Sequence, residues 1–189
     1  MHIILASSSP FRRALLERIR LPFTTESPNL DETRQEGESP EAMVRRLSEA
    51  KAAAIAERHP DALVIGSDQA AVLDGGILGK PGGYPQAVAQ LAACSGHEVR
   101  FYTGLCVLGP RQRFIHMDST RVRFRELTGT EIERYLKLEQ PYQSAGSFKV
   151  EGLGISLFES IQSEDPTALI GLPLIALCRL LRQLGIAIP

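Results

Sequence analysis

The chain has 189 residues, of which 43% are hydrophobic, and its 21 basic and 22 acidic residues give a formal net charge of -1. This composition is typical of a globular protein and excludes an extended disordered chain. The balanced charge argues against a protein that binds DNA or RNA polymers, because neutralising many phosphates needs a basic excess. A small anionic ligand is compatible with it, because a local cluster of Lys and Arg can hold one.

Targeting and redox signals are weak throughout the chain. The N-terminal run Ile3–Ala6 is apolar for only four residues and has no basic lead-in, so it is too short for a signal peptide. No stretch of about 18 apolar residues occurs, so we expect no membrane attachment. The three cysteines lie far apart within apolar runs, and the four histidines show no ligand spacing. We therefore expect a cytoplasmic protein with reduced core cysteines and no His-based metal site.

Strands and helices alternate in the first half of the chain. Ser9-Pro10 and Ser39-Pro40 each combine an N-cap with a proline suited to the first helical position. The segment between the two helices, 27–39, is rich in Asp, Glu, Pro and Gly and predicts a loop. The expected elements are a strand at 3–6, a helix from residue 10, a strand at 21–26, a helix at 41–58, a strand at 62–66 and a hairpin joining 70–73 to 77–78.

The second half predicts two long strands and further helices. Thr128 and Glu131 have the spacing of a capping box, which begins a helix reaching about Leu138. Arg121, Arg123 and Arg125 alternate with apolar residues and predict a solvated sheet face. The expected elements are a helix at 85–94, strands at 99–108 and 114–125, the capped helix, a strand at 154–161 and a helix at 172–184. Long hairpins beside strand–helix units predict the α/β class with a mixed sheet.

The first candidate site is the segment Ser7-Ser8-Ser9-Pro10-Phe11-Arg12-Arg13, which lies between a strand and a helix N-terminus. Free backbone N–H groups and the positive end of the helix dipole favour a phosphate there, and hydroxyls and guanidinium groups stand beside them. Taken alone, the same segment is equally compatible with a helix cap followed by two solvated arginines.

The second candidate is Gly66-Ser67-Asp68-Gln69, which follows a predicted buried strand. Open α/β sheets present catalytic groups at such strand ends, and Asp68 could hold a divalent cation or act as a base on water. The alternative is an Asp that only forms a turn.

Two later segments are glycine-rich. Leu78-Gly79-Lys80-Pro81-Gly82 is not a P-loop, because the preceding glycine is one position too close and Pro81 replaces the Ser or Thr that holds magnesium. Lys80 could still contact a phosphate as a point charge, or be a turn lysine without a role. In the segment 145–154 the glycines permit close approach to a ligand, and Glu151 could accept hydrogen bonds from a base. The alternative for that segment is a glycine-rich hairpin.

Taken together and in order, these segments resemble the Maf-like nucleoside triphosphate pyrophosphatases. The similarity extends from about Ile3 to Ile186. Each segment alone is a weak signal, but their occurrence together in this order is highly specific for the family. The segments are Leu5-Ala6-Ser7-Ser8-Ser9-Pro10, Asp31-Glu32-Thr33, Gly66-Ser67-Asp68-Gln69, Gly79-Lys80-Pro81, Phe101-Tyr102-Thr103-Gly104-Leu105, Ala145-Gly146-Ser147-Phe148-Lys149, Glu151-Gly152 and Gly171-Leu172-Pro173-Leu174.

The resemblance implies a single domain over residues 1–189 with a two-lobed α/β fold around a central cleft, shared with inosine triphosphate pyrophosphatases. It implies a homodimer that hydrolyses a nucleoside triphosphate to a monophosphate and pyrophosphate with a divalent cation, Mg²⁺ or Mn²⁺. By its match to the family, Asp68 is the catalytic carboxylate, and Glu32 is a further acidic position in the cleft, where both could hold the metal. The polyphosphate-binding positions are Ser8, Arg12, Lys51 and Lys80.

The substrate-selecting positions are Phe11, Gln69 and Glu151. The branch of the family that acts on dTTP and UTP carries arginine, usually threonine, and glutamine there, and this chain departs from that branch at all three. The resemblance is closest to the branch that acts on 7-methyl-GTP, which often has tryptophan at the first position. An aromatic face attracts the cationic methylated base, and a carboxylate can accept its N–H donors. The alternatives are a Maf-type enzyme for another nucleotide and a non-catalytic nucleotide-binding regulator of septum formation.

Overall fold

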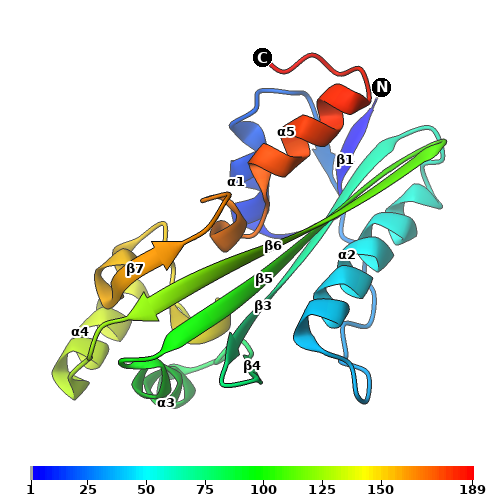
Figure 1. Ribbon diagram of the computed structural model, residues 1–189. Coiled ribbons are helices and arrows are strands. Elements are labelled where there is room, and N and C mark those ends of the chain that lie inside the picture. The colour runs from blue at the N-terminus through cyan, green and yellow to red at the C-terminus, as the bar shows by residue number, and fades with distance from the viewer. Residues whose placement is uncertain (1) are drawn as a thin grey trace. The chain divides into compact units, whose positions relative to one another are not determined.

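The computed structural model describes residues 2–189, which form two compact units (Figure 1). The first unit comprises the chain up to Gln69 together with Tyr102–Asp118 and Asp165–Pro189. The second unit comprises Ala70–Phe101 and Ser119–Glu164. Three long strands contribute residues to both units, so the chain passes between them several times. The division agrees with the two-lobed fold that the family resemblance implies.

The sheet is mixed, as expected from the sequence. Its order is β2-β1-β3-β5-β6-β7, with β4 paired to β3. Strand β1 is parallel to both of its neighbours, whereas β3 with β4 and β6 with β7 are antiparallel. The strands are β1 (Ile3–Leu5), β2 (Thr24–Thr25), β3 (Leu63–Leu73), β4 (Gly76–Leu78), β5 (Glu98–Gly109), β6 (Gln112–Phe124) and β7 (Phe158–Gln162).

The first unit has a hydrophobic layer on each face of its strands. Side chains alternate across a strand, so Ile3 and Leu5 join one layer, and Ile4 joins the other. The first layer packs on helices α1 (Pro10–Glu17) and α5 (Leu174–Gln183), and the second packs on α2 (Pro40–Ala56). Figure 1 shows α1 and α5 on one side of β1 and α2 on the other. A polar side chain on one of these strands therefore faces either α1 and α5 or α2. Its place in the alternation of side chains along the strand decides which.

The second unit is built around four phenylalanines from both of its chain segments. Phe148 contacts Phe101 and Phe158 edge to face, with ring centroids 5.4 and 4.9 Å apart, and Phe124 joins the same cluster. Such edge-to-face contacts stabilise by about 0.5–1.5 kcal/mol each beyond the burial of area. The helices of this unit are α3 (Tyr84–Cys94) and α4 (Gly129–Glu139), with 3₁₀ turns η1 (Ala145–Ser147) and η2 (Leu153–Leu157). The capping box of Thr128 and Glu131 is present, as predicted.

Three strand predictions need correction. The strands predicted at 62–66 and 70–73 are one continuous strand, β3, so Asp68 lies inside a strand and not after it. The strand predicted at 21–26 is only two residues long, because its partner β1 is short and Pro22 has no N–H to donate. The strand predicted at 154–161 begins later, because the N–H groups of Leu153 and Gly154 bind the Glu139 carboxylate and the Lys149 carbonyl.

The remaining predictions on cysteines and membranes have simple outcomes. All three cysteines are free, and burial raises the pKa of the Cys94 and Cys106 thiols to about 12. These two are inert core residues, as expected. Over the part of the chain that the structure describes, no helix is long and apolar enough to cross a bilayer.

Candidate active site

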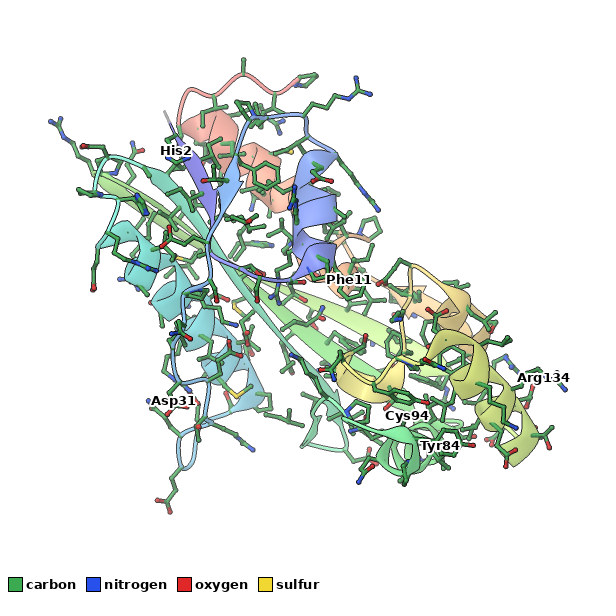
Figure 2. All side chains as sticks on the ribbon, turned by 180° about the vertical axis from the view of Figure 1, so that it is seen from behind. His2, Phe11, Asp31, Tyr84, Cys94 and Arg134 are labelled. Carbon is green, nitrogen blue, oxygen red and sulfur yellow. The ribbon has the colours of Figure 1, made fainter. Side chains whose placement is uncertain are left out.

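The N-terminus of α1 has the geometry that its sequence predicts. Ser9 is the N-cap, and its hydroxyl accepts a hydrogen bond from the backbone N–H of Arg12, while Pro10 takes the first helical position. Ser7 is buried and accepts the N–H of Ser9 at 3.1 Å, and Ser8 is exposed. Figure 2 shows Phe11 at this end of the helix, where its side chain is half-buried. The helix end therefore offers hydroxyl and backbone donors to an anion.

The pleat of β3 separates the candidate residues 66–69 between the two faces of the strand. The side chain of Asp68 points toward α2 and that of Ser67 toward the α1 and α5 side, as their hydrogen-bond partners show. The alternation therefore places Asp68 with α2 and Gln69 with the segment that precedes α5. Neighbouring residues of this motif thus contact different elements of the fold.

Asp68 lies at the centre of a charged cluster. Its Oδ1 is 2.6 Å from the ammonium of Lys51 on α2, and both side chains are buried. The same ammonium lies 2.8 Å from Oε1 of Glu32, which is exposed in the loop before α2. The backbone N–H of Asp68 donates to the hydroxyl of Ser48 at 3.0 Å. One lysine therefore joins the two carboxylates that the sequence predicts for the site.

Close packing of α2 on the strands sets the position of this cluster. A Cβ on Gly66 would lie 2.7 Å from the backbone nitrogen of Ala52, and one on Gly104 would lie 3.0 Å from the side chain of Val44. Both glycines let the helix backbone approach the sheet more closely than any other residue would allow. Because α2 lies so close to β3, Ser48 and Lys51, which are one helical turn apart, both reach Asp68.

Opposing effects set the protonation of Asp68. Burial raises the pKa of this carboxyl, whereas the charges of Lys51 and Arg12 lower it and Glu32 raises it. The net direction is upward from the ordinary Asp value, which favours a proton acceptor that works nearer to neutral pH. Burial lowers the pKa of Arg12, while Asp68 and Glu32 raise it. Arg12 therefore lies within the field of the same carboxylates.

Three other residues predicted for the site, Gln69, Lys80 and Glu151, lie outside the charged cluster around Asp68. The Gln69 amide donates to the hydroxyl of Thr103 at 2.9 Å and to the carbonyl of Ala168 at 2.8 Å. Lys80 and Glu151 belong to the second unit, and both are exposed. Of the residues predicted for the site, the contacts join Asp68, Lys51 and Glu32.

Glu151 lies in a turn that is organised by α4. The carboxylate of Glu139, the last residue of α4, accepts the N–H of Leu153 at 2.9 Å and lies 3.4 Å from the ammonium of Lys149. A Cβ on Gly152 would lie 2.7 Å from the same carboxylate, so a larger residue there would displace the Glu139 side chain. The turn that presents Glu151 is thus fixed by a residue that sequence reasoning did not single out.

The carboxylates of Asp68 and Glu32 suit a hard divalent cation whose remaining ligands come from the substrate and water. Among residues 2–189, no group of three or more His, Cys, Asp or Glu side chains is arranged to hold a metal. Asp68 and Glu32 nevertheless place carboxylate oxygens around one ammonium, at 2.6 and 2.8 Å. Mg²⁺ is usually bound by one or two carboxylates together with water and substrate phosphates. The pair therefore suits a cation that arrives with a nucleotide.

Sequence reasoning missed Ser48 and assigned no role to Gly171. Ser48 is fully buried and accepts the Asp68 N–H, and Gly171 presents its carbonyl to the Arg12 side chain. The helical spacing of Ser48 and Lys51 was a signal that both share one face. For Gly171 the position in a family motif was the only signal.

Comparisons with known proteins find a family model and relatives that match nearly the whole chain. The family model described as "Maf-like protein" matches residues 2–184. A protein named 7-methyl-GTP pyrophosphatase from Xanthomonas axonopodis is 57% identical over 187 residues, covering 99% of this chain and 98% of that protein. One of the same name from Pseudomonas aeruginosa is 53% identical, with coverage of 99% and 98%. A HAM1 protein structure from Coxiella burnetii has a TM-score of 0.53 at 13% identity, covers 98% of each chain and shares the fold.

Proposed function

Because this chain belongs to the Maf-like protein family, we propose that it is a nucleoside triphosphate pyrophosphatase that hydrolyses 7-methyl-GTP to 7-methyl-GMP and pyrophosphate. The observation that carries the proposal is the buried Asp68, paired with Lys51 and linked through it to Glu32. The choice of substrate is supported by relatives at 57% and 53% identity that are named for that reaction.

Asp68 is the proton acceptor of the proposed reaction. A water molecule attacks the α-phosphorus, its proton passes to the Asp68 carboxylate, and the bond from the α-phosphorus to the bridging oxygen of the β-phosphate breaks. Pyrophosphate leaves with the electron pair of that bond. The upward direction of the Asp68 pKa supports this role, because a base is most effective when its pKa lies close to the working pH.

Basic groups hold the triphosphate. Arg12 offers a guanidinium at the N-terminal end of α1, and Ser8 adds an exposed hydroxyl. The Lys51 ammonium has three donors and two carboxylate partners, which leaves one donor for a phosphate oxygen. Lys80, exposed in the second unit, adds a further point charge. A divalent cation held by Asp68 and Glu32 would supply charge neutralisation at the phosphates when it is bound.

Phe11 and Glu151 select the base in this proposal. N7-methylation makes guanine cationic, and its N1–H and exocyclic amine are donors. An aromatic face attracts such a cation by about 0.5–2 kcal/mol, and a carboxylate can accept both donors while opposing the charge. Both side chains are accessible, since Phe11 is half-buried and Glu151 is exposed.

We place the reaction in the cytoplasm, in a homodimer whose chains each use both units as one functional domain. The cytoplasmic placement is supported by the three free cysteines, which suit a reducing compartment. The single domain is supported by β3, β5 and β6, each of which contributes residues to both units. The dimer rests on the family resemblance, and sedimentation of the native chain tests it.

The test is a panel of ordinary and methylated nucleoside triphosphates assayed with magnesium for pyrophosphate release. We expect the highest kcat/KM with 7-methyl-GTP. Run in ¹⁸O-labelled water, the reaction should place the label in the nucleoside monophosphate, because the α-phosphorus is attacked. Label in pyrophosphate or orthophosphate, or equal use of GTP and 7-methyl-GTP, would contradict the proposal.

A further inference from the structure

The carbonyl of Gly171 is a shared acceptor at the edge of the charged cluster. The Nε–H of Arg12 donates to it at 2.8 Å, and the hydroxyl of Ser67 lies 2.9 Å from it. Gly171 is buried and follows the 3₁₀ turn η3 (Ala168–Ile170). A side chain from α1 and one from β3 therefore meet at a single backbone oxygen.

The turn that presents this carbonyl is fixed from the sheet. The amide nitrogen of Gln69 on β3 lies 2.8 Å from the carbonyl of Ala168 and 3.1 Å from that of Leu169. The buried hydroxyl of Thr103 on β5 also donates to the Ala168 carbonyl, at 3.0 Å. Three contacts from β3 and β5 to the carbonyls of Ala168 and Leu169 thus hold η3, and with it the Gly171 carbonyl, in one position.

The backbone conformation at residue 171 favours glycine. Its φ of +125° is a conformation that residues with a side chain rarely adopt. A Cβ there would also lie 3.4 Å from Nε and 3.6 Å from Cγ of Arg12. Any side chain would therefore strain the turn, and its Cβ would stand in van der Waals contact with the arginine.

Within the described part of the chain, the guanidinium of Arg12 is therefore held through its Nε alone, which donates to the Gly171 carbonyl. Among residues 2–189, no hydrogen bond engages either terminal nitrogen of this side chain, since the bond from Nε to Gly171 is its one side-chain hydrogen bond. The two terminal groups remain available as the planar fork that matches phosphate oxygens. Fixing Nε in advance reduces the conformational freedom that Arg12 would lose on binding an anion.

We propose that Gly171 is a positioning residue for Arg12, and that Gln69 acts on the nucleotide through the same turn. This inference rests on the proposed function, because it takes the polyphosphate as the ligand of Arg12. It gives Gln69 a role in holding η3, with no need for contact between its amide and the base. It also gives a role to the Gly171 motif, which the sequence alone left without one.

The test is a double-mutant cycle on the binding of inorganic pyrophosphate in magnesium buffer, measured by calorimetry. Gly171→Ala and Gln69→Leu are each made in the native background and in Arg12→Lys. The lysine keeps a charge, so that binding stays measurable, but it has no Nε–H for the Gly171 carbonyl. We expect each change to weaken binding about tenfold in the native background and less than about twofold with Arg12→Lys, because residues that act together are non-additive.

Gly185→Ala is the matched control. Gly185 also has a positive φ, of +78°, but a Cβ there would meet nothing within 4 Å. It should cost stability without weakening pyrophosphate binding. If Gly171→Ala does not fold, Gln69→Leu carries the test. Equal losses in both arginine backgrounds, unchanged binding in folded variants, or native protein that does not bind pyrophosphate would each overturn the inference.

The outcomes separate this inference from the proposed function. Additive losses in an enzyme that still releases pyrophosphate from 7-methyl-GTP refute the positioning role alone. A non-additive cycle in a protein that hydrolyses no triphosphate refutes the proposed function and leaves the positioning of Arg12 supported.

Discussion

Lys51 and Asp68 form a buried ion pair, with the ammonium 2.6 Å from one carboxylate oxygen, between a helix and the middle of a strand. Burial raises the pKa of Asp68 despite this pairing. Breaking a buried pair by removing one partner commonly costs about 3–5 kcal/mol, because it leaves an uncompensated charge. The pair therefore couples the chemistry of the site to the stability of the first unit.

Asp68→Asn should abolish most pyrophosphatase activity while the protein stays folded. The amide is nearly isosteric with the carboxylate, but it cannot accept a proton from water and is a poor metal ligand. Loss of a general base commonly costs about 100-fold or more in rate. Pyrophosphate release with 7-methyl-GTP measures kcat, and circular dichroism checks the fold. Asp61→Asn, at an exposed position, is the control. Near-normal turnover in a folded Asp68→Asn protein would place the base elsewhere, with Glu32 the next candidate.

Lys51→Met should move the acidic limb of the pH profile of kcat to higher pH. Lys51 lowers the pKa of Asp68 by its charge and its hydrogen bond, so its removal lets burial raise that pKa further. A carboxyl with a raised pKa favours the folded state while protonated, and this stability is lost as pH rises through the folded pKa. As pH rises above the ordinary Asp pKa, the melting temperature of Lys51→Met should therefore fall more steeply than that of the native protein. Lys137→Met, at an exposed helical position, should change neither profile, and an unmoved limb in Lys51→Met would refute the coupling.

The elements that could be predicted from sequence are those fixed by local chemistry. Ser9, Ser39 and Thr128 cap their helices as predicted, because an N-cap needs only its own side chain and the next three residues. The continuity of β3 through Asp68 could not be predicted in this way. It depends on strand neighbours and on the approach of α2 to Gly66, which are distant in sequence.

The same distinction applies to the site. Asp68, Lys51 and Glu32 were chosen as family positions, and the structure joins them through one ammonium. The contact of Ser48 with Asp68 spans 20 residues, and that of Arg12 with Gly171 spans 159. No periodicity or spacing in the sequence predicts a contact with a backbone carbonyl that far along the chain. The role of Gly171 could therefore be inferred only from the tertiary structure.

Gly66→Ala should destabilise the protein strongly. A Cβ there would lie 2.7 Å from the backbone nitrogen of Ala52, and a helix backbone cannot move aside as a flexible side chain can. Overpacking of this kind typically costs about 1–3 kcal/mol, and occasionally more. Urea denaturation measures the loss. Gly129→Ala is the matched control, since a Cβ at that first residue of α4 would meet nothing within 4 Å. Similar stability of the two variants would mean that α2 does not pack on the strand as described.

Phe11→Ala should weaken the use of 7-methyl-GTP by about tenfold, since a cation–π contact of about 1.4 kcal/mol corresponds to one decade. GTP lacks the positive charge and should lose less. The measurement is the ratio of kcat/KM for the two substrates. Phe11→Trp keeps an aromatic face and should retain the preference for 7-methyl-GTP. Equal losses on both substrates would instead indicate a pocket for neutral bases.

Glu151→Gln should reduce the use of 7-methyl-GTP more than Phe11→Ala does. The substitution keeps the size of the side chain but removes its charge and turns one acceptor into a donor. The N1–H and amine of a bound guanine then face a mismatched group, and a polar group left unpaired costs more than the hydrogen bond contributed. We expect a loss of more than about tenfold in kcat/KM with 7-methyl-GTP and a smaller loss with GTP, because only the methylated base also loses a charge attraction. Glu133→Gln, exposed on α4 of the same unit, is the control and should leave both values unchanged. If the preference for 7-methyl-GTP survives Glu151→Gln intact, base selection does not depend on this carboxylate.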